Sequence, residues 1–191
     1  MTETRPIRFT SSGKPVAPDE LVKLESRMGR RLPAEFREFL LKNNVASPES
    51  NIYEFGNNST AVERFLGVSE KDADDLVAVN HMYEGRLPRD MIAIGMAAGG
   101  NLICLHIQNG AVYFWDHEGE AMGDDVPSLD NMDHLSPSFA SFLAALRSYT
   151  KDIASNPGDV STVWKKPGFE EKFKKYLSDD KPAVQKDENT K

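Results

Sequence analysis

A predicted β-hairpin in the middle of the chain constrains the fold more than any other feature. Two runs rich in β-forming residues, Leu102–Gln108 and Ala111–His117, are separated only by Asn109-Gly110. Asn-Gly between such runs favours a two-residue type I′ turn, because both central residues of that turn need positive φ. The sequence therefore predicts an antiparallel pair here, with Met91–Gly95 as a third strand before it.

Two helices are predicted before this sheet. The first begins near Asp19, has apolar residues at helical spacing and ends at Gly29. The second opens at Leu32-Pro33, since proline suits a first helical turn, and buries Phe36, Phe39 and Leu40. Asn43-Asn44 is predicted as its left-handed exit, because Asn tolerates positive φ better than most residues.

Further elements are predicted on either side of the central strands. The runs 52–55 and 61–68 are candidate strands, and the acidic run Glu70–Asp75 is expected to cap a helix over Leu76–Tyr83. A closing helix is expected to be capped by Ser136 and to begin with Pro137. Its apolar face comprises Phe139, Phe142, Leu143 and Leu146. Helices, an antiparallel sheet and a closing helix in this order predict an α+β domain.

The composition divides the chain into three expected parts. Residues 1–17 are expected to form a flexible N-terminal lead, 18–150 the folded domain, and 151–191 an extension with one short helix and a disordered tail. The apolar stretches are too short to span a bilayer, and the N-terminus lacks the apolar core of a secretory signal. The single cysteine, Cys104, lies mid-strand and is read as a core residue in a cytoplasmic protein.

The negative charge is concentrated in one segment. The chain has a net charge of −7 at pH 7, yet between Asp90 and Leu146 there are eight acidic residues and no Lys or Arg. That segment carries −8, and the remainder sums to +1. Such a segment disfavours direct nucleic-acid binding, since phosphates would repel it. It suits a basic protein partner, whose approach it would accelerate.

Three patterns that could suggest chemistry have simpler interpretations. Asp116-His117-Glu118 alternate along the predicted strand, so they cannot converge on a metal with His106. The glycine-rich loop 95–101 lacks the GK(S/T) ending of a phosphate loop and precedes a strand, which favours a tight turn. The serines near His134 are explained by helix capping. No catalytic residue, metal or cofactor is expected.

The order of elements and three motifs resemble the SMI1/KNR4 family, also called the SUKH superfamily. LPAEFREFLLKNN at 32–44 is similar to that family's LP-x-x-(F/Y)-x-x-F-L helix. IAIGMAAGGNLICLHI at 92–107 and AVYFWDHEGE at 111–120 are similar to its strand–turn–strand and its VY-x-(W/F) strand. The resemblance covers roughly residues 18–150 and implies a mostly antiparallel sheet wrapped by helices. The family often has an acid after the paired glycines, where this chain has Asn101.

The resemblance implies a binding module, since bacterial members are largely immunity proteins that neutralise toxins and a fungal branch acts as an interaction hub. The leading hypothesis is an immunity protein that blocks a basic, possibly nuclease, toxin by stoichiometric binding. The expected partner-binding residues are the acids of the hairpin's end and the following loop, Asp116, Glu118, Glu120, Asp124 and Asp125. The alternative is an adaptor that docks an endogenous protein through the amphipathic, locally basic segment 164–177. An unrecognised enzyme has the lowest weight.

Overall fold

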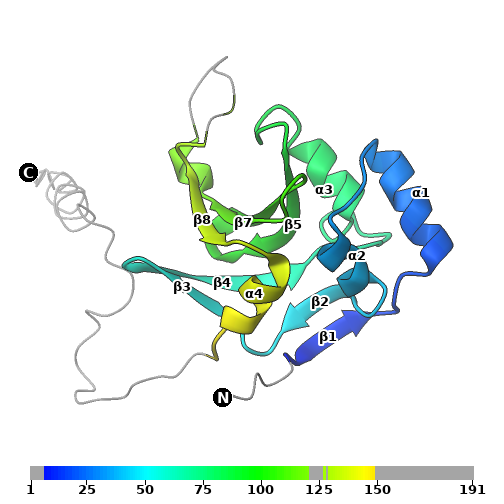
Figure 1. Cartoon of the computed structure of the whole chain (residues 1–191), viewed down its shortest axis with the longest axis horizontal. Helices are drawn as coiled ribbons and strands as arrows, with labels where there is room; N and C mark the ends of the chain where they lie inside the picture. Colours follow the sequence, from blue (N-terminus) through cyan, green and yellow to red (C-terminus); the bar gives the residue numbers. More distant parts are fainter. Residues whose placement is uncertain (1–6, 121–126, 128, 149–191) are drawn as a thin grey trace, which may run out of the picture. The chain divides into compact units, whose positions relative to one another are not determined.

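Six antiparallel strands in chain order form the main sheet of the computed structural model, which describes residues 7–120, 127 and 129–148 (Figure 1). Each strand is hydrogen-bonded to the next along the chain. The strands are β3 (Ile52–Phe55), β4 (Asn58–Phe65), β5 (Met91–Ala97), β6 (Asn101–His106), β7 (Val112–Trp115) and β8 (Met132–Ser136). The predicted α+β class and the predicted trio β5–β6–β7 are both confirmed.

The sheet curves until its two edge strands approach each other. The hydroxyl of Tyr53 on β3 donates to the backbone carbonyl of Leu135 on β8. The ring of Phe55 also contacts that of Phe114 on β7, with centroids 5.3 Å apart. The edges of this nearly barrel-like sheet are therefore joined through side chains, while β5 and β6 in its middle are buried along almost their whole length.

A second, two-stranded sheet joins β1 (Phe9–Gly13) to β2 (Asn44–Pro48). A flexible lead was expected over 1–17, and over Phe9–Gly13 that expectation is wrong because these residues pair with β2. Asn44 begins β2 instead of ending the preceding helix in a left-handed turn. Its side chain bonds the backbone N–H and C=O of Val68, at 2.8 and 2.9 Å, and the left-handed residue is Val45, with φ 49°.

Four of the predicted helices are present: α1 (Pro18–Met28), α2 (Ala34–Leu40), α3 (Leu76–Met82) and α4 (Phe139–Ala145). The first three begin and end close to where the sequence places them. The short helix predicted within 151–191 lies outside the described residues. Gly29 ends α1 with φ 65°, and Asp75 caps α3 by accepting from two backbone N–H groups. The cap of α4 is Ser138 and not Ser136, because Ser136 is the buried last residue of β8.

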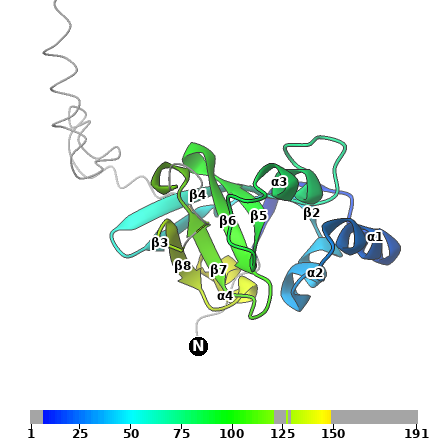
Figure 2. The ribbon, with the colours of Figure 1, turned by 90° about the horizontal axis from the view of Figure 1, so that it is seen from above.

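Aromatic rings fix α2 and α4 against the sheet. Phe39 of α2 contacts Phe65 of β4 at 5.2 Å and Phe139 of α4 at 5.3 Å between ring centroids. Phe36 contacts Phe139 as well, at 5.3 Å. Such edge-to-face pairs contribute roughly 0.5–1.5 kcal/mol each beyond the area they bury. Figure 2 shows α1, α2 and α3 grouped at one end of the sheet, away from β3.

The turn between β6 and β7 differs from the predicted type I′ geometry. Of its two central residues only Gly110 has positive φ, at 73°. The N–H of Gly110 donates to the carbonyl of His106, and the side chain of Asn109 accepts from the N–H of Ala111. The hairpin thus closes through a longer turn, in which Asn stabilises the backbone by its side chain instead of by positive φ.

Candidate partner-binding site

The chain leaves the sheet immediately after Trp115, at the start of the predicted acidic site. Residues His117–Gly119 form a short 3-10 helix, η2, and not the end of a strand. Asp116 caps this helix, since its Oδ1 accepts from the N–H of Glu118 at 3.0 Å. The predicted alternation of Asp116, His117 and Glu118 along a strand is therefore wrong.

Asn101 positions η2 from the neighbouring glycine-rich turn. Its Oδ1 accepts from the N–H of His117 at 3.1 Å and lies 2.8 Å from the Nδ1 atom of that residue. Its Nδ2 donates to the carbonyl of Ala98 at 3.1 Å. Gly99 and Gly100, with φ of 78° and 82°, turn the chain between β5 and β6 as predicted. A carboxylate at position 101 would lack the N–H donor that bonds the carbonyl of Ala98. Asn therefore fits this turn better than the acid that is common in the family this sequence resembles.

Two neighbouring segments at this end of the sheet carry four acids, which we call the acidic corner: Asp116, Glu118, Asp130 and Asp133. Two hydrogen bonds join their segments, from the N–H of Asp116 to the carbonyl of Asn131 at 2.9 Å and from Asn131 Nδ2 to the carbonyl of Asp116 at 3.0 Å. Asp116 is half-buried, and the other three acids are exposed. Asp130 and Asp133 were missing from the predicted site, although they belong to the same Lys- and Arg-free segment.

Glu120 is engaged in an intramolecular ion pair. Its two carboxylate oxygens accept from Nε and Nη2 of Arg86 at 2.8 and 2.6 Å. The hydrogen bond from Arg86 lowers the pKa of Glu120 below its ordinary value. The guanidinium also lies 4.7 Å from the ring centroid of Tyr83 and 5.3 Å from that of Trp115. Glu120 thus attaches the end of η2 to the loop after α3; the predicted residues Asp124 and Asp125 lie outside the described residues.

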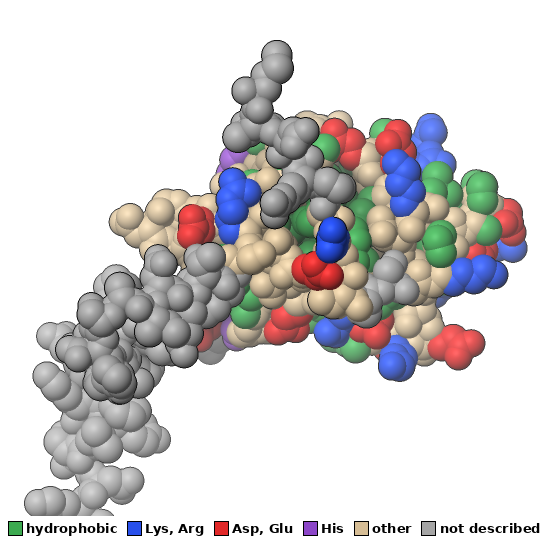
Figure 3. Space-filling model, turned by 90° about the horizontal axis from the view of Figure 1, so that it is seen from below, with side chains coloured by type: hydrophobic (Ala, Val, Ile, Leu, Met, Phe, Trp, Pro, Cys, Tyr) green, Lys and Arg blue, Asp and Glu red, His purple; other side chains and the backbone are tan. Residues whose placement is uncertain are grey.

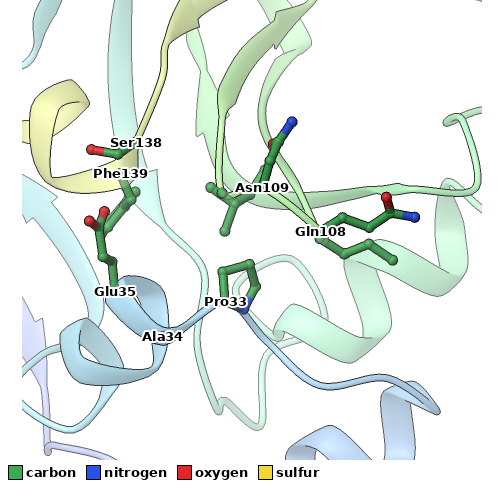
Figure 4. A pocket seen from close by; sticks show the side chains of 10 residues that line it. Pro33, Ala34, Glu35, Gln108, Asn109, Ser138 and Phe139 are labelled. Carbon is green, nitrogen blue, oxygen red and sulfur yellow. The ribbon is translucent and has the colours of Figure 1, made fainter.

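A small open pocket of about 260 Å³ lies where α2, the β6–β7 turn and α4 meet (Figure 4). Its polar groups serve the fold: the Glu35 carboxylate accepts from the N–H of Ala140 at 2.8 Å, and Ser138 caps α4. The LPAEF motif thereby connects α2 to the start of the closing helix.

Burial raises the pKa of the Cys104 thiol, as expected for a core residue. The described part of the chain holds no group of three or more metal-ligating His, Cys, Asp or Glu residues.

A larger groove of about 900 Å³ lies between α1, α3 and the loop that leads into β5. Apolar residues line it together with three arginines, Arg27, Arg30 and Arg89. Sequence reasoning missed it because its residues come from segments about sixty positions apart, each of which is unremarkable alone.

On the face drawn in Figure 3, Lys and Arg side chains lie beside Asp and Glu, so that face is not dominated by one sign of charge.

These features define the structural class: an α+β protein built on one curved antiparallel main sheet, with charged groups on its surface. A model of the SMI1 / KNR4 family (SUKH-1) matches residues 15–145, and the chain belongs to this family. It is similar to the SPbeta prophage-derived uncharacterized protein YokK of Bacillus subtilis (strain 168), with 32% identity over 119 residues. The match covers 52% of this chain and 62% of YokK, so the chain spans less than two thirds of that relative.

Among the described residues, no helix combines the length and the apolar character that crossing a bilayer demands.

Proposed function

We propose that this protein is a cytoplasmic immunity protein, which neutralises a cognate basic toxin by binding it in a stoichiometric complex. Membership of the SMI1/KNR4 family supports a protein-binding role. The observation that carries the proposal is the acidic corner, in which two segments joined by hydrogen bonds present Asp116, Glu118, Asp130 and Asp133 together. A nuclease toxin would offer the complementary surface, since it needs basic residues to hold phosphates.

The proposed mechanism is occlusion. Exposed carboxylates attract a basic surface over about one Debye length, roughly 8–10 Å at ordinary ionic strength, and so accelerate its encounter. Contacts at the centre of the interface would then hold the complex, because charges at the rim mainly affect the association rate. In this assignment Glu120 supports the corner from within through Arg86, while Asp116 both caps η2 and contributes charge.

The test is affinity capture with the full chain as bait, from lysate of its source cells at low salt. Bound proteins are identified by mass spectrometry, expressed alone to measure toxicity, and expressed again with the bait. Recovery of one basic partner in a one-to-one complex, toxic alone and harmless with the bait, is the expected result.

Two variants make this test specific. In the first, the corner is neutralised with Asp116→Asn, Glu118→Gln, Asp130→Asn and Asp133→Asn. In the matched control, four exposed acids elsewhere are neutralised with Glu38→Gln, Glu49→Gln, Glu70→Gln and Asp72→Asn. Capture and protection should fall with the corner variant and persist with the control. Equal capture by both variants would exclude the corner as the docking surface, and a non-toxic partner would refute the immunity function.

A further inference from the structure

The groove between α1 and α3 combines an apolar floor with a basic rim. Met28, Val77 and Leu87 are among the apolar residues that line it, together with Met91 and Ile92 at the start of β5. Met91 and Ile92 are 4% and 1% exposed, so the floor is continuous with the hydrophobic core. A hollow of about 900 Å³ is within the size range of sites that bind ligands or anchor residues of a partner.

The walls of the groove are fixed to the sheet by Asn80. Its Nδ2 donates to the carbonyl of Ala93 on β5 at 2.8 Å, and its Oδ1 accepts from the N–H of the same residue at 2.9 Å. A further bond from Nδ2 reaches the carbonyl of Leu76 within α3. On the other side, Nη1 of Arg30 donates to the carbonyl of Arg89 at 3.0 Å. The groove is therefore preorganised, which reduces the ordering cost of binding.

The rim carries positive charge that the described residues do not neutralise. Arg27 lies 3.6 Å from the buried carboxylate of Asp75, whereas neither Arg30 nor Arg89 has a carboxylate within salt-bridge distance among those residues. Among the described residues that line the groove, the one acid is Glu84, and it contacts His81 at 3.0 Å. A basic rim is notable in a chain of net charge −7, and it is complementary to an acidic partner.

We propose that this groove binds an acidic, apolar segment of another protein, with large apolar side chains on the floor and Asp or Glu side chains against Arg30 and Arg89. The apolar floor favours such a segment over an inorganic anion, because a phosphate would leave that floor exposed to water. Arginine suits the rim, since its planar guanidinium can bind a carboxylate through two parallel hydrogen bonds. None of the four acids of the corner lines the groove, and the two surfaces are opposite in charge, so this proposal does not depend on the immunity function.

The experiment is a selection from a random peptide library displayed on phage, with the full chain as bait. Selected peptides are synthesised, and their dissociation constants are measured by isothermal titration calorimetry. Peptides with apolar residues flanked by Asp or Glu should be enriched. Their affinity should fall at least about tenfold, or 1.4 kcal/mol, for the Arg30→Glu/Arg89→Glu variant. The matched control, Arg8→Glu/Lys42→Glu, changes the same net charge outside the groove and should leave affinity within about twofold.

Three outcomes would overturn the proposal. The first is a consensus without acidic residues, or no enrichment at all. The second is equal affinity for the wild type and the groove variant, with circular dichroism confirming that both are folded. The third is a concentration-dependent dimer that the groove variant abolishes, because a second copy of the chain would then occupy the groove. A neutral floor variant, Val77→Asn, separates charge from burial: it should weaken the same peptides while leaving both arginines and the net charge unchanged.

Discussion

The acidic corner and the arginine-rimmed groove differ in how their charges are supported. In the corner, two of the carboxylates lie at the short helix η2 and two at or before β8, in a stretch of sequence without Lys or Arg. In the groove, arginines border a floor that belongs to the hydrophobic core. The first arrangement can attract a charged partner from a distance, whereas the second can also bury apolar area. We therefore expect salt to affect binding at the corner more strongly than binding at the groove, where apolar burial adds to the charge pairs.

The largest expected effect is a loss of folding stability at the groove, caused by Asn80→Ala. Asn80→Ala removes the hydrogen bonds that attach α3 to β5 and leaves the backbone groups of Ala93 without these partners. Since an unsatisfied buried group costs roughly 1–3 kcal/mol, the free energy of unfolding should fall by about 3 kcal/mol. Urea denaturation measures this, and groove peptides should weaken in parallel.

Asn43→Ala is the matched control for Asn80. Among the described residues, the side chain of Asn43 makes one long bond of 3.5 Å, so its loss should cost less than about 0.5 kcal/mol. Equal destabilisation by the two Asn variants would contradict the role assigned to Asn80.

A smaller effect is expected at the turn that supports the corner. Gly100 has φ 82°, so Gly100→Ala should destabilise the protein by about 1 kcal/mol through backbone strain and should disturb η2 through Asn101. Gly100→Asn should recover part of the loss, because Asn tolerates positive φ. Thermal unfolding compares the variants; identical melting temperatures for Ala and Asn would argue against strain as the cause.

The Arg86–Glu120 pair predicts a pH effect of similar or smaller size. The pKa of Glu120 is lowered in the folded protein, so the pair stabilises the fold above the ordinary value of 4.5. That contribution is lost as the pH falls through the lowered pKa. Both side chains are partly exposed, which limits the effect to about 1 kcal/mol or less. Unfolding of the wild type and of Glu120→Gln at pH 7 and pH 3 tests this: the difference present at pH 7 should shrink at pH 3.

The smallest effect on stability should accompany the clearest effect on binding kinetics. Asp116→Asn/Glu118→Gln keeps the η2 cap, because Asn is also a good capping residue. The free energy of unfolding should change by less than about 0.5 kcal/mol, while association with a basic partner slows several-fold at low salt. Stopped-flow mixing measures the rate. A change confined to dissociation would place these acids at the centre of an interface and not at a steering rim.

The sequence predicted the elements that local apolar patterning determines and missed those that depend on contacts between distant residues. Strands β5–β7 and the buried faces of α2 and α4 were predictable, because apolar patterning within a short window determines them. Strands β1, β2 and β8 were missed, since each is short and partly polar and is stabilised by pairing with its partner strand. Asn44 and Ser136 resembled a helix exit and a helix cap, yet both are buried in sheets. Local patterns cannot distinguish such roles, because distant contacts assign them.

The candidate site was predictable in its charge and not in its geometry. The absence of Lys and Arg around Asp116 and Glu118 is visible in the sequence. Neither the ion pair that engages Glu120 nor the hydrogen bonds that bring Asp130 and Asp133 beside η2 can be read from spacing. The groove depends in the same way on the approach of α1 to α3.

The most direct test of the electrostatic account is the association rate of the captured basic partner across about 50 to 300 mM NaCl, where screening increases steadily. The wild type should lose association rate steeply as salt rises, and the fully neutralised corner variant should start slower and vary little. The Arg30→Glu/Arg89→Glu variant should keep the steep salt dependence of the wild type, because its acidic corner is unchanged. A rate that is independent of salt, or a corner variant with the salt dependence of the wild type, would contradict the assignment of the acidic corner as the surface that attracts the partner.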